Sequence, residues 1–72
     1  MDGKKLKSIL TLNGESQQDL ADVLGLSAVT VSYKINESKG REFTQSEIRK
    51  IKEHYGLTAE QVDDIFFNHF VS

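Results

Sequence analysis

Apolar residues recur along this chain at intervals of three and four, the spacing that places side chains on one face of an α-helix. Leu6, Ile9 and Leu10 form one such stripe near the start of the chain. The cluster of β-branched residues at 29–31 lies within a segment that has the same helical spacing. The pattern predicts an all-α fold of about five short helices. They are expected over residues 4–12, 17–24, 28–35, 45–55 and from about 59 toward His69.

Serine and threonine residues stand where four of these helices are predicted to begin. A side-chain oxygen there can accept a hydrogen bond from a backbone N–H that the helix leaves unpaired. The four N-cap candidates are Ser16, Ser27, Thr44 and Thr58. The last two are each followed, three residues on, by the Glu or Gln that completes a capping box. Glycine, which readily adopts the left-handed conformation of a C-terminal cap, marks the helix ends at Gly14, Gly25 and Gly56.

Residues 17–36, QQDLADVLGLSAVTVSYKIN, combine these signals in one place. Ala21 offers a small side chain where two helices would cross closely, and Gly25 permits a tight turn between them. The apolar residues expected to face inward are Leu20, Leu24, Leu26, Val31 and Ile35. Those expected to face outward from the second helix are Ala28, Val29, Ser32 and Tyr33. This layout is typical of a helix-turn-helix, whose second helix can enter the DNA major groove.

A plain helical hairpin is the alternative interpretation of the same stretch. It accounts for the leucines equally well. It does not explain why Ala21 and Gly25 lie four residues apart, or why the N-cap candidate Ser27 follows two residues after the glycine. It also leaves Val29 and Tyr33 pointing outward, one turn apart, without a purpose. The helix-turn-helix interpretation is therefore favoured.

The length of 72 residues indicates a single domain with a small core. A chain this short leaves little room for a catalytic cleft, so neither an enzyme nor a catalytic residue is predicted. There is no cysteine, which excludes disulfides and cysteine zinc sites. His54 and His69 show no repeated ligand spacing, so no metal site and no cofactor is predicted.

The charge of the chain is distributed unevenly, although its net value is only −2. Up to Lys52 there are nine basic and seven acidic residues, whereas the remainder carries four acidic residues and no basic one. This asymmetry permits DNA binding at one face without demonstrating it. No apolar run is long enough to cross a bilayer and no signal-peptide pattern occurs at the start. The sequence therefore predicts a soluble cytoplasmic protein with no membrane partner.

The chain resembles the lambda-repressor-like domain of the Cro/Xre family, which occurs in phage repressors and bacterial regulators. LADVLGLSAVTVSYKIN resembles the second and third helices of that domain, and EFTQSEIRKIKEHYGLTAEQVDDIF resembles its fourth and fifth. The resemblance covers almost the whole chain and is greatest to small phage-encoded members. It implies a five-helix domain that binds double-stranded operator DNA, usually as a homodimer on a two-fold-related site.

The resemblance assigns expected roles to several positions. Gln17 matches the residue that bonds a phosphate from the start of the second helix. The positions that usually meet base edges are Ser27, Ala28, Val29 and Tyr33. Family members often carry glutamine where this chain has Ala28 and Val29, which can touch a thymine methyl group but cannot hydrogen-bond a base. Polar readout would then fall to Thr30, Ser32, Tyr33 or Lys34, or to bridging water.

Basic residues at the end of the third helix and in the following loop are the candidates for phosphate contacts. They are Lys34, Lys39 and Arg41. Many family members have an apolar residue at the position of Lys34, but Ile35 is expected to take over that core role here and leave Lys34 free. The alternative for the loop, NESKGRE at 36–42, is an ordinary solvated segment.

Aromatic residues crowd the C-terminal end of the chain. Phe66 is expected in the core, whereas Phe67 and Phe70 would lie on another face of the last helix. A small monomer has little reason to expose two phenylalanines, so a homodimer contact through them is one expectation. The alternative is that the tail folds back and covers the core.

The sequence thus predicts a DNA-binding transcriptional regulator, phage- or prophage-repressor-like, with no small-molecule substrate. The alternative function is a protein-interaction module on the same fold, such as an antitoxin or a phage adaptor. The acidic total charge and the apolar pair Ala28 and Val29 favour that alternative.

Overall fold

The computed structural model describes residues 1–67, except for the side chain of Lys39. Within that range the chain forms five α-helices and no strand: α1 (Gly3–Leu12), α2 (Gln17–Leu24), α3 (Ala28–Ile35), α4 (Gln45–Tyr55) and α5 (Ala59–Val62). A 3-10 turn, η1 (Ser38–Gly40), precedes α4, and a π-helical turn, η2 (Asp63–Phe67), continues α5. The predicted all-α class is confirmed, and the first four helices have the predicted bounds to within one residue.

Side-chain caps define the start of every α-helix in this range. The four predicted N-caps, Ser16, Ser27, Thr44 and Thr58, all accept a hydrogen bond from the backbone N–H three residues on. Both predicted capping boxes are also present. Two further caps have no counterpart in the prediction. Asp2 caps α1 through the Lys5 N–H, and Asp19 completes a third box with Ser16 because its shorter carboxylate still reaches the Ser16 N–H at 2.8 Å.

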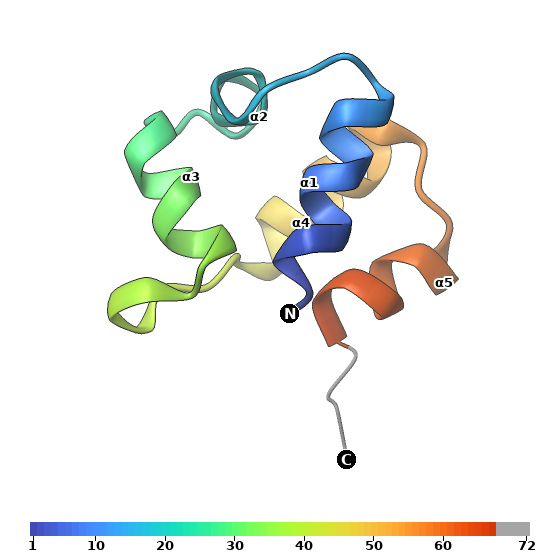
Figure 1. Ribbon diagram of the computed structural model, residues 1–72. Helices are drawn as coiled ribbons and strands as arrows, with labels where there is room; N and C mark the ends of the chain where they lie inside the picture. Colours follow the sequence, from blue (N-terminus) through green and yellow to red (C-terminus); the bar gives the residue numbers. More distant parts are fainter. Residues whose placement is uncertain (68–72) are drawn as a thin grey trace.

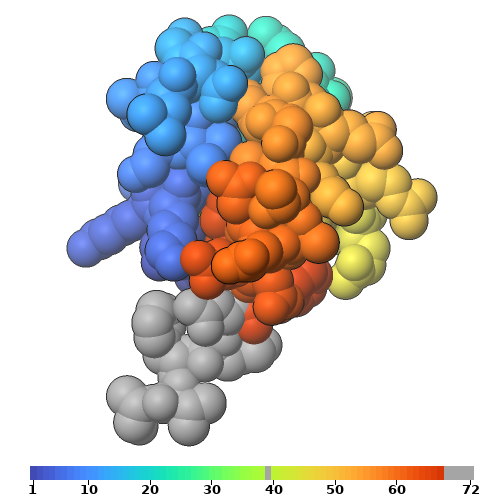
Figure 2. Space-filling model, turned by 90° about the vertical axis from the view of Figure 1, so that its right-hand side faces the viewer, coloured from blue at the N-terminus to red at the C-terminus, as the bar shows by residue number. Residues whose placement is uncertain are grey.

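The helices enclose one apolar core. Figure 1 shows α1 and α4 between the α2–α3 pair and α5, and Figure 2 shows α1 (blue) lying against the α5 end of the chain (orange to red). The core consists of Leu6, Leu10, Leu20, Ala21, Leu24, Val31, Ile35, Phe43, Ile48, Ile51, Leu57, Val62, Ile65 and Phe66. The predicted inward residues Ile9, Leu26 and Tyr55 are partly buried against it. Phe43 and Phe66 meet edge to face with ring centroids 5.9 Å apart.

The last helix departs from the prediction. The helix begins at Ala59 as predicted, but it is not α-helical throughout, because α5 ends at Val62 and the π-helical turn continues it to Phe67. In this turn Ile65 and Phe66 are both buried, and the Ile65 carbonyl accepts a hydrogen bond from the Asp2 N–H at 2.6 Å. That bond joins the two ends of the described chain, so no local pattern announces it. His69 and Phe70 lie outside the described residues.

The N-terminal residues are fastened to the end of α3 as well as to η2. A Cβ atom on Gly3 would lie 2.9 Å from the Ile35 carbonyl oxygen, so only glycine fits this close approach without a shift. The Met1 ammonium forms an ion pair with Glu37 at 2.9 Å. Of the helices within residues 1–67, none combines the length and the apolar character needed to cross a lipid bilayer.

Candidate nucleic-acid interface

A three-residue turn joins α2 to α3 and sets the orientation of both helices. Gly25 adopts a left-handed conformation (φ 70°), and the Leu26 N–H donates to the Ala21 carbonyl at 2.9 Å. Ala21 has no exposed surface, and its helix α2 packs against both α3 and α4. In Figure 1, α2 is seen nearly along its axis while α3 runs across the view, so the two helices are far from parallel. Ala21 and Gly25 are the two residues on which the predicted helix-turn-helix depends.

The outward face of α3 is mixed in exposure. Val29 is 61% exposed, whereas Ala28, Ser32 and Tyr33 are half-buried. Thr30 lies at the edge of this face. None of these residues belongs to the core, in agreement with the predicted outward set. The face therefore offers an exposed aliphatic side chain beside hydroxyl and phenol groups.

The first turn of α3 uses its hydroxyl groups locally. Ser27 Oγ accepts a hydrogen bond from the Thr30 N–H at 3.1 Å and donates one to Thr30 Oγ1 at 2.9 Å. The Ser27 hydrogen is thus engaged within the helix, while the Thr30 hydroxyl keeps its own hydrogen for another acceptor. At the start of α2, Gln17 follows the Ser16 capping box directly. Its position at the first residue of the helix is the one predicted for a phosphate contact.

Lys34 is not free, contrary to the prediction, because it is paired with Glu47; a phosphate contact through Lys34 stays a prediction. Its ammonium pairs with Glu47 Oε1 at 2.8 Å, donates to the Glu42 carbonyl at 3.2 Å and lies 5.9 Å from the centroid of the Phe43 ring. The Lys34 side chain is only 12% exposed. Ile35 does take the core position, as predicted, but Lys34 is turned to α4 instead of toward solvent. Thirteen residues separate this lysine from its glutamate, so the pairing has no local sequence signal.

Glu47 has a perturbed pKa as a result. Partial burial by itself raises the pKa of this carboxyl group. The Lys34 ammonium and the Thr44 donors together favour the charged form more strongly, so the pKa lies below its ordinary value of 4.5. The same oxygen atom, Oε1, accepts from Lys34 and from the Thr44 N–H. One carboxylate thus joins the end of α3 to the start of α4.

The loop after α3 brings Arg41 to the outward face of that helix. Glu37 adopts a left-handed conformation (φ 52°), η1 follows, and Arg41 leaves it in an extended conformation. The guanidinium carbon of Arg41 then lies 5.7 Å from the centroid of the Tyr33 ring. Of the two loop cations predicted to contact phosphate, Arg41 is exposed beside the α3 face, and the side chain of Lys39 lies outside the described part of the chain.

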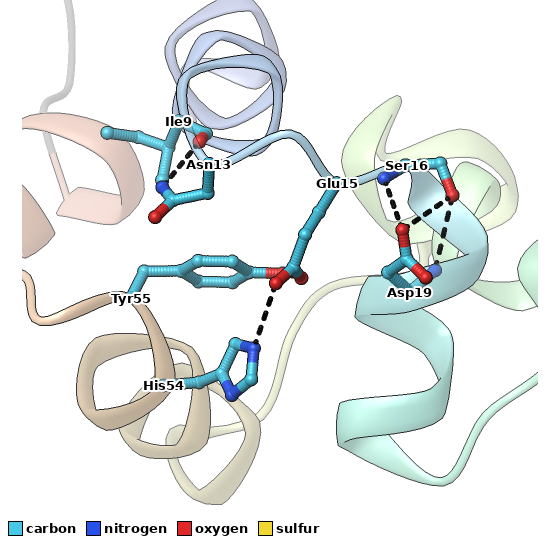
Figure 3. A network of polar contacts seen from close by, with 7 residues as sticks. All are labelled: Ile9, Asn13, Glu15, Ser16, Asp19, His54 and Tyr55. Carbon is cyan, nitrogen blue, oxygen red and sulfur yellow. Dashed lines mark hydrogen bonds and ion pairs between the residues drawn. The ribbon is translucent and has the colours of Figure 1, made fainter.

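A polar network connects the loop between α1 and α2 to the end of α4 (Figure 3). Glu15, in the loop between α1 and α2, accepts a hydrogen bond from the Tyr55 hydroxyl at 2.9 Å and contacts His54 Nε2 at 3.4 Å. Burial and the adjacent Glu15 carboxylate raise the pKa of the Tyr55 phenol. Both partners come from the end of α4, so the network fixes the α1–α2 loop relative to that helix. His54 is engaged here, and the described residues contain no group of three or more side chains placed to hold a metal ion.

Replacing Tyr55 with phenylalanine should lower the free energy of unfolding by about 1 kcal/mol, because a partly buried hydrogen bond to a carboxylate is removed. Urea unfolding followed by circular dichroism measures the change. Glu53→Gln, at an exposed position of the same helix, is the control and should leave the midpoint almost unchanged. Equal midpoints for Tyr55→Phe and the wild type would show that the bond adds nothing to stability.

A hollow of about 240 Å³ with a mixed polar and apolar lining lies between the N-terminus, the start of α4 and η2. Met1, Phe43, Phe66 and Phe67 line it, and Glu37 and Glu42 stand among them. Phe67 is 41% exposed, in line with its predicted position on a face separate from the core. A dimer contact through Phe67 and Phe70 stays a prediction, and Phe70 lies outside the described residues.

Comparison of the chain with protein-family models, with curated proteins and with solved structures finds no match.

Proposed function

We propose that this protein is a sequence-specific DNA-binding regulator that uses α2 and α3 as a helix-turn-helix and places α3 in the major groove. The observation that carries the proposal is the junction of the two helices. Ala21 on α2 is fully buried, Gly25 between the two helices has a positive φ, and the outward face of α3 has no core role. A helix that is anchored in this way and presented outward has the width that the major groove of B-DNA admits.

Residues on and near α3 can make two kinds of contact with DNA, one to the bases and one to the phosphate backbone. Val29 can contact a thymine methyl group, while Ser32 and Tyr33 can hydrogen-bond base edges. Gln17, at the start of α2, and the loop residues Lys39 and Arg41 can position the protein on the phosphate backbone. Since Lys34 is held by Glu47, the phosphate contacts rest on fewer cations than the sequence predicts. Regulation of the phage-repressor type, on a two-fold-related operator, is the form of this function that we propose.

A protein-interaction module on the same fold is the second candidate function. The exposed Val29 favours it, since an aliphatic side chain can pack against a protein as well as against a thymine methyl group. The pairing of Lys34 with Glu47 also favours the protein-interaction module, because a positive charge is then missing from the edge of the outward face of α3. The two functions differ in a simple property: only the first requires affinity for duplex DNA at low salt.

Selection of binding sites from random duplexes, followed by titration on selected and scrambled sequences, tests the proposal directly. A regulator of the proposed kind enriches one sequence and prefers it over the scrambled duplex by about 10³-fold or more. Equal binding to both duplexes contradicts sequence-specific recognition. Absence of binding to any duplex at low salt contradicts the DNA-binding function and favours the protein-interaction module.

Replacing Lys39 and Arg41 together with alanine should weaken binding to selected and scrambled duplexes alike. Removing one phosphate contact lowers the slope of log K against log salt by about 0.9, so the double variant should show a slope smaller by about 1.8. Fluorescence anisotropy titrations at several salt concentrations measure this slope. Arg49→Ala with Lys50→Ala removes the same charges from exposed positions on α4 and is the matched control. A slope that falls equally in both double variants would mean that only net charge matters.

A further inference from the structure

Arg41, in the loop after α3, contacts Tyr33 on the outward face of that helix. The guanidinium carbon lies 5.7 Å from the ring centroid, within the range of a cation–π interaction. The ring belongs to a half-buried residue of α3, whereas Arg41 is exposed. The guanidinium group of Arg41 thus lies over the Tyr33 ring.

The backbone of the loop holds Arg41 in this place. The Glu37 N–H donates to the Lys34 carbonyl at 3.2 Å, and the Arg41 N–H donates to the Ser38 carbonyl at 3.1 Å. The Met1 ammonium binds the Glu37 carboxylate at 2.9 Å. The bonds of Glu37 tie the start of η1 to α3 and to the N-terminus, and the bond of Arg41 closes η1 itself. The contact between Arg41 and Tyr33 therefore follows from the conformation of the loop.

We propose that Arg41 is a positioning residue that fixes the orientation of the Tyr33 ring, so that the choice between base pairs depends on its planar guanidinium group. This inference rests on the proposed DNA-binding function. A side chain that is already oriented in the free protein loses less freedom on binding, which favours the one arrangement that fits the preferred sequence. A guanidinium group can cover a ring with its face and still donate to a phosphate from its edge, which an ammonium group cannot do.

A double-mutant cycle separates positioning from simple charge. Arg41→Lys keeps the charge but removes the planar group, and Arg49→Lys makes the same change at an exposed position of α4 as the control. We expect Arg41→Lys to reduce the ratio of affinities for selected and scrambled duplexes about two- to fivefold, since any loss common to both duplexes cancels from this ratio. In a Tyr33→Ala background, Arg41→Lys should cause no further reduction of this ratio, because the ring that it orients is absent.

The free protein offers a readout that does not depend on DNA. Ring current from Tyr33 should shift the Arg41 side-chain proton resonances upfield in the wild type, and Tyr33→Ala should abolish the shift. The inference is overturned if the shift is absent, if Arg41→Lys retains the wild-type ratio, or if its effects and those of Tyr33→Ala simply add. These outcomes leave DNA binding by the wild type intact. If the wild type itself binds no duplex, the proposed function falls and this inference falls with it.

Discussion

Replacing Glu47 with alanine is expected to lower the free energy of unfolding by about 3 kcal/mol. The carboxylate accepts from the Thr44 N–H at 2.9 Å and from the Lys34 ammonium at 2.8 Å. Its removal deletes one of the two bonds of the α4 capping box, worth about 1 kcal/mol, and leaves a largely buried ammonium without its anion, which costs about 2 kcal/mol more. For a domain of this size the melting temperature should fall by about 10 °C or more, as thermal unfolding measures.

Two further variants show which contacts of Glu47 account for this loss of stability. Glu53→Ala removes an exposed carboxylate from the same helix and should change stability by less than about 0.5 kcal/mol. Lys34→Met keeps the aliphatic stem and the capping box but removes the cation, so it should cost less than Glu47→Ala. Equal stability of Glu47→Ala and Glu53→Ala would show that the α3–α4 link is energetically unimportant.

The same carboxylate gives stability a pH dependence. Because the pKa of Glu47 is lower in the folded chain, its contribution is fully present above the ordinary value of 4.5. The contribution is lost as the pH falls from there through the folded-state pKa, since the carboxyl group then takes up a proton in both states. Unfolding midpoints of the wild type and Glu47→Gln should therefore converge at low pH. A constant difference between them across the acid range would contradict this linkage.

Replacing Ala21 with leucine is expected to cost about 3 kcal/mol and to leave much of the protein unfolded at 37 °C. Ala21 is fully buried on α2, which packs against α3 and α4, so an isobutyl group can be accommodated only if neighbouring helices move apart. Circular dichroism during urea titration measures the destabilisation.

Ala59→Leu is the control for this substitution. Ala59 is the first residue of α5 and is exposed, so the same change adds bulk there without displacing a neighbouring helix. Its unfolding midpoint should stay close to that of the wild type. If Ala21→Leu were as stable as Ala59→Leu, the crossing of α2 and α3 would be loose enough to repack, and the tight junction invoked for DNA recognition would lose its support.

The features predicted correctly from the sequence are those encoded within one turn of chain. Thr44 with Glu47 and Thr58 with Gln61 announce helix starts because the two bonds of a capping box join residues three apart. Gly25 and Gly56 announce helix ends because both have positive φ. Apolar spacing identifies Val31 and Ile35 as inward residues for the same local reason.

The features that escape prediction depend on contacts between distant residues. The sequence predicts a free Lys34 because its partner, Glu47, lies across a loop. The π-helical turn contains Ile65, whose carbonyl accepts a hydrogen bond from Asp2 near the start of the chain. Arg41 is identifiable as a loop cation, but its contact with Tyr33 requires the left-handed Glu37 and the 3-10 turn. The candidate site can thus be located from sequence, whereas the arrangement of its charges cannot.

The caps described for the five α-helices also bear on how fast the chain folds. Each N-cap joins atoms only three residues apart, so it can form in the unfolded ensemble without closing a long loop. Other bonds close long loops, for example those from Asp2 to Ile65 and from Tyr55 to Glu15. They lie near the ends of helices whose starts are already set by caps. Helical domains dominated by local contacts fold in about microseconds to milliseconds. We therefore expect the docking of preformed helical turns, and not the formation of the helices, to limit the rate of folding.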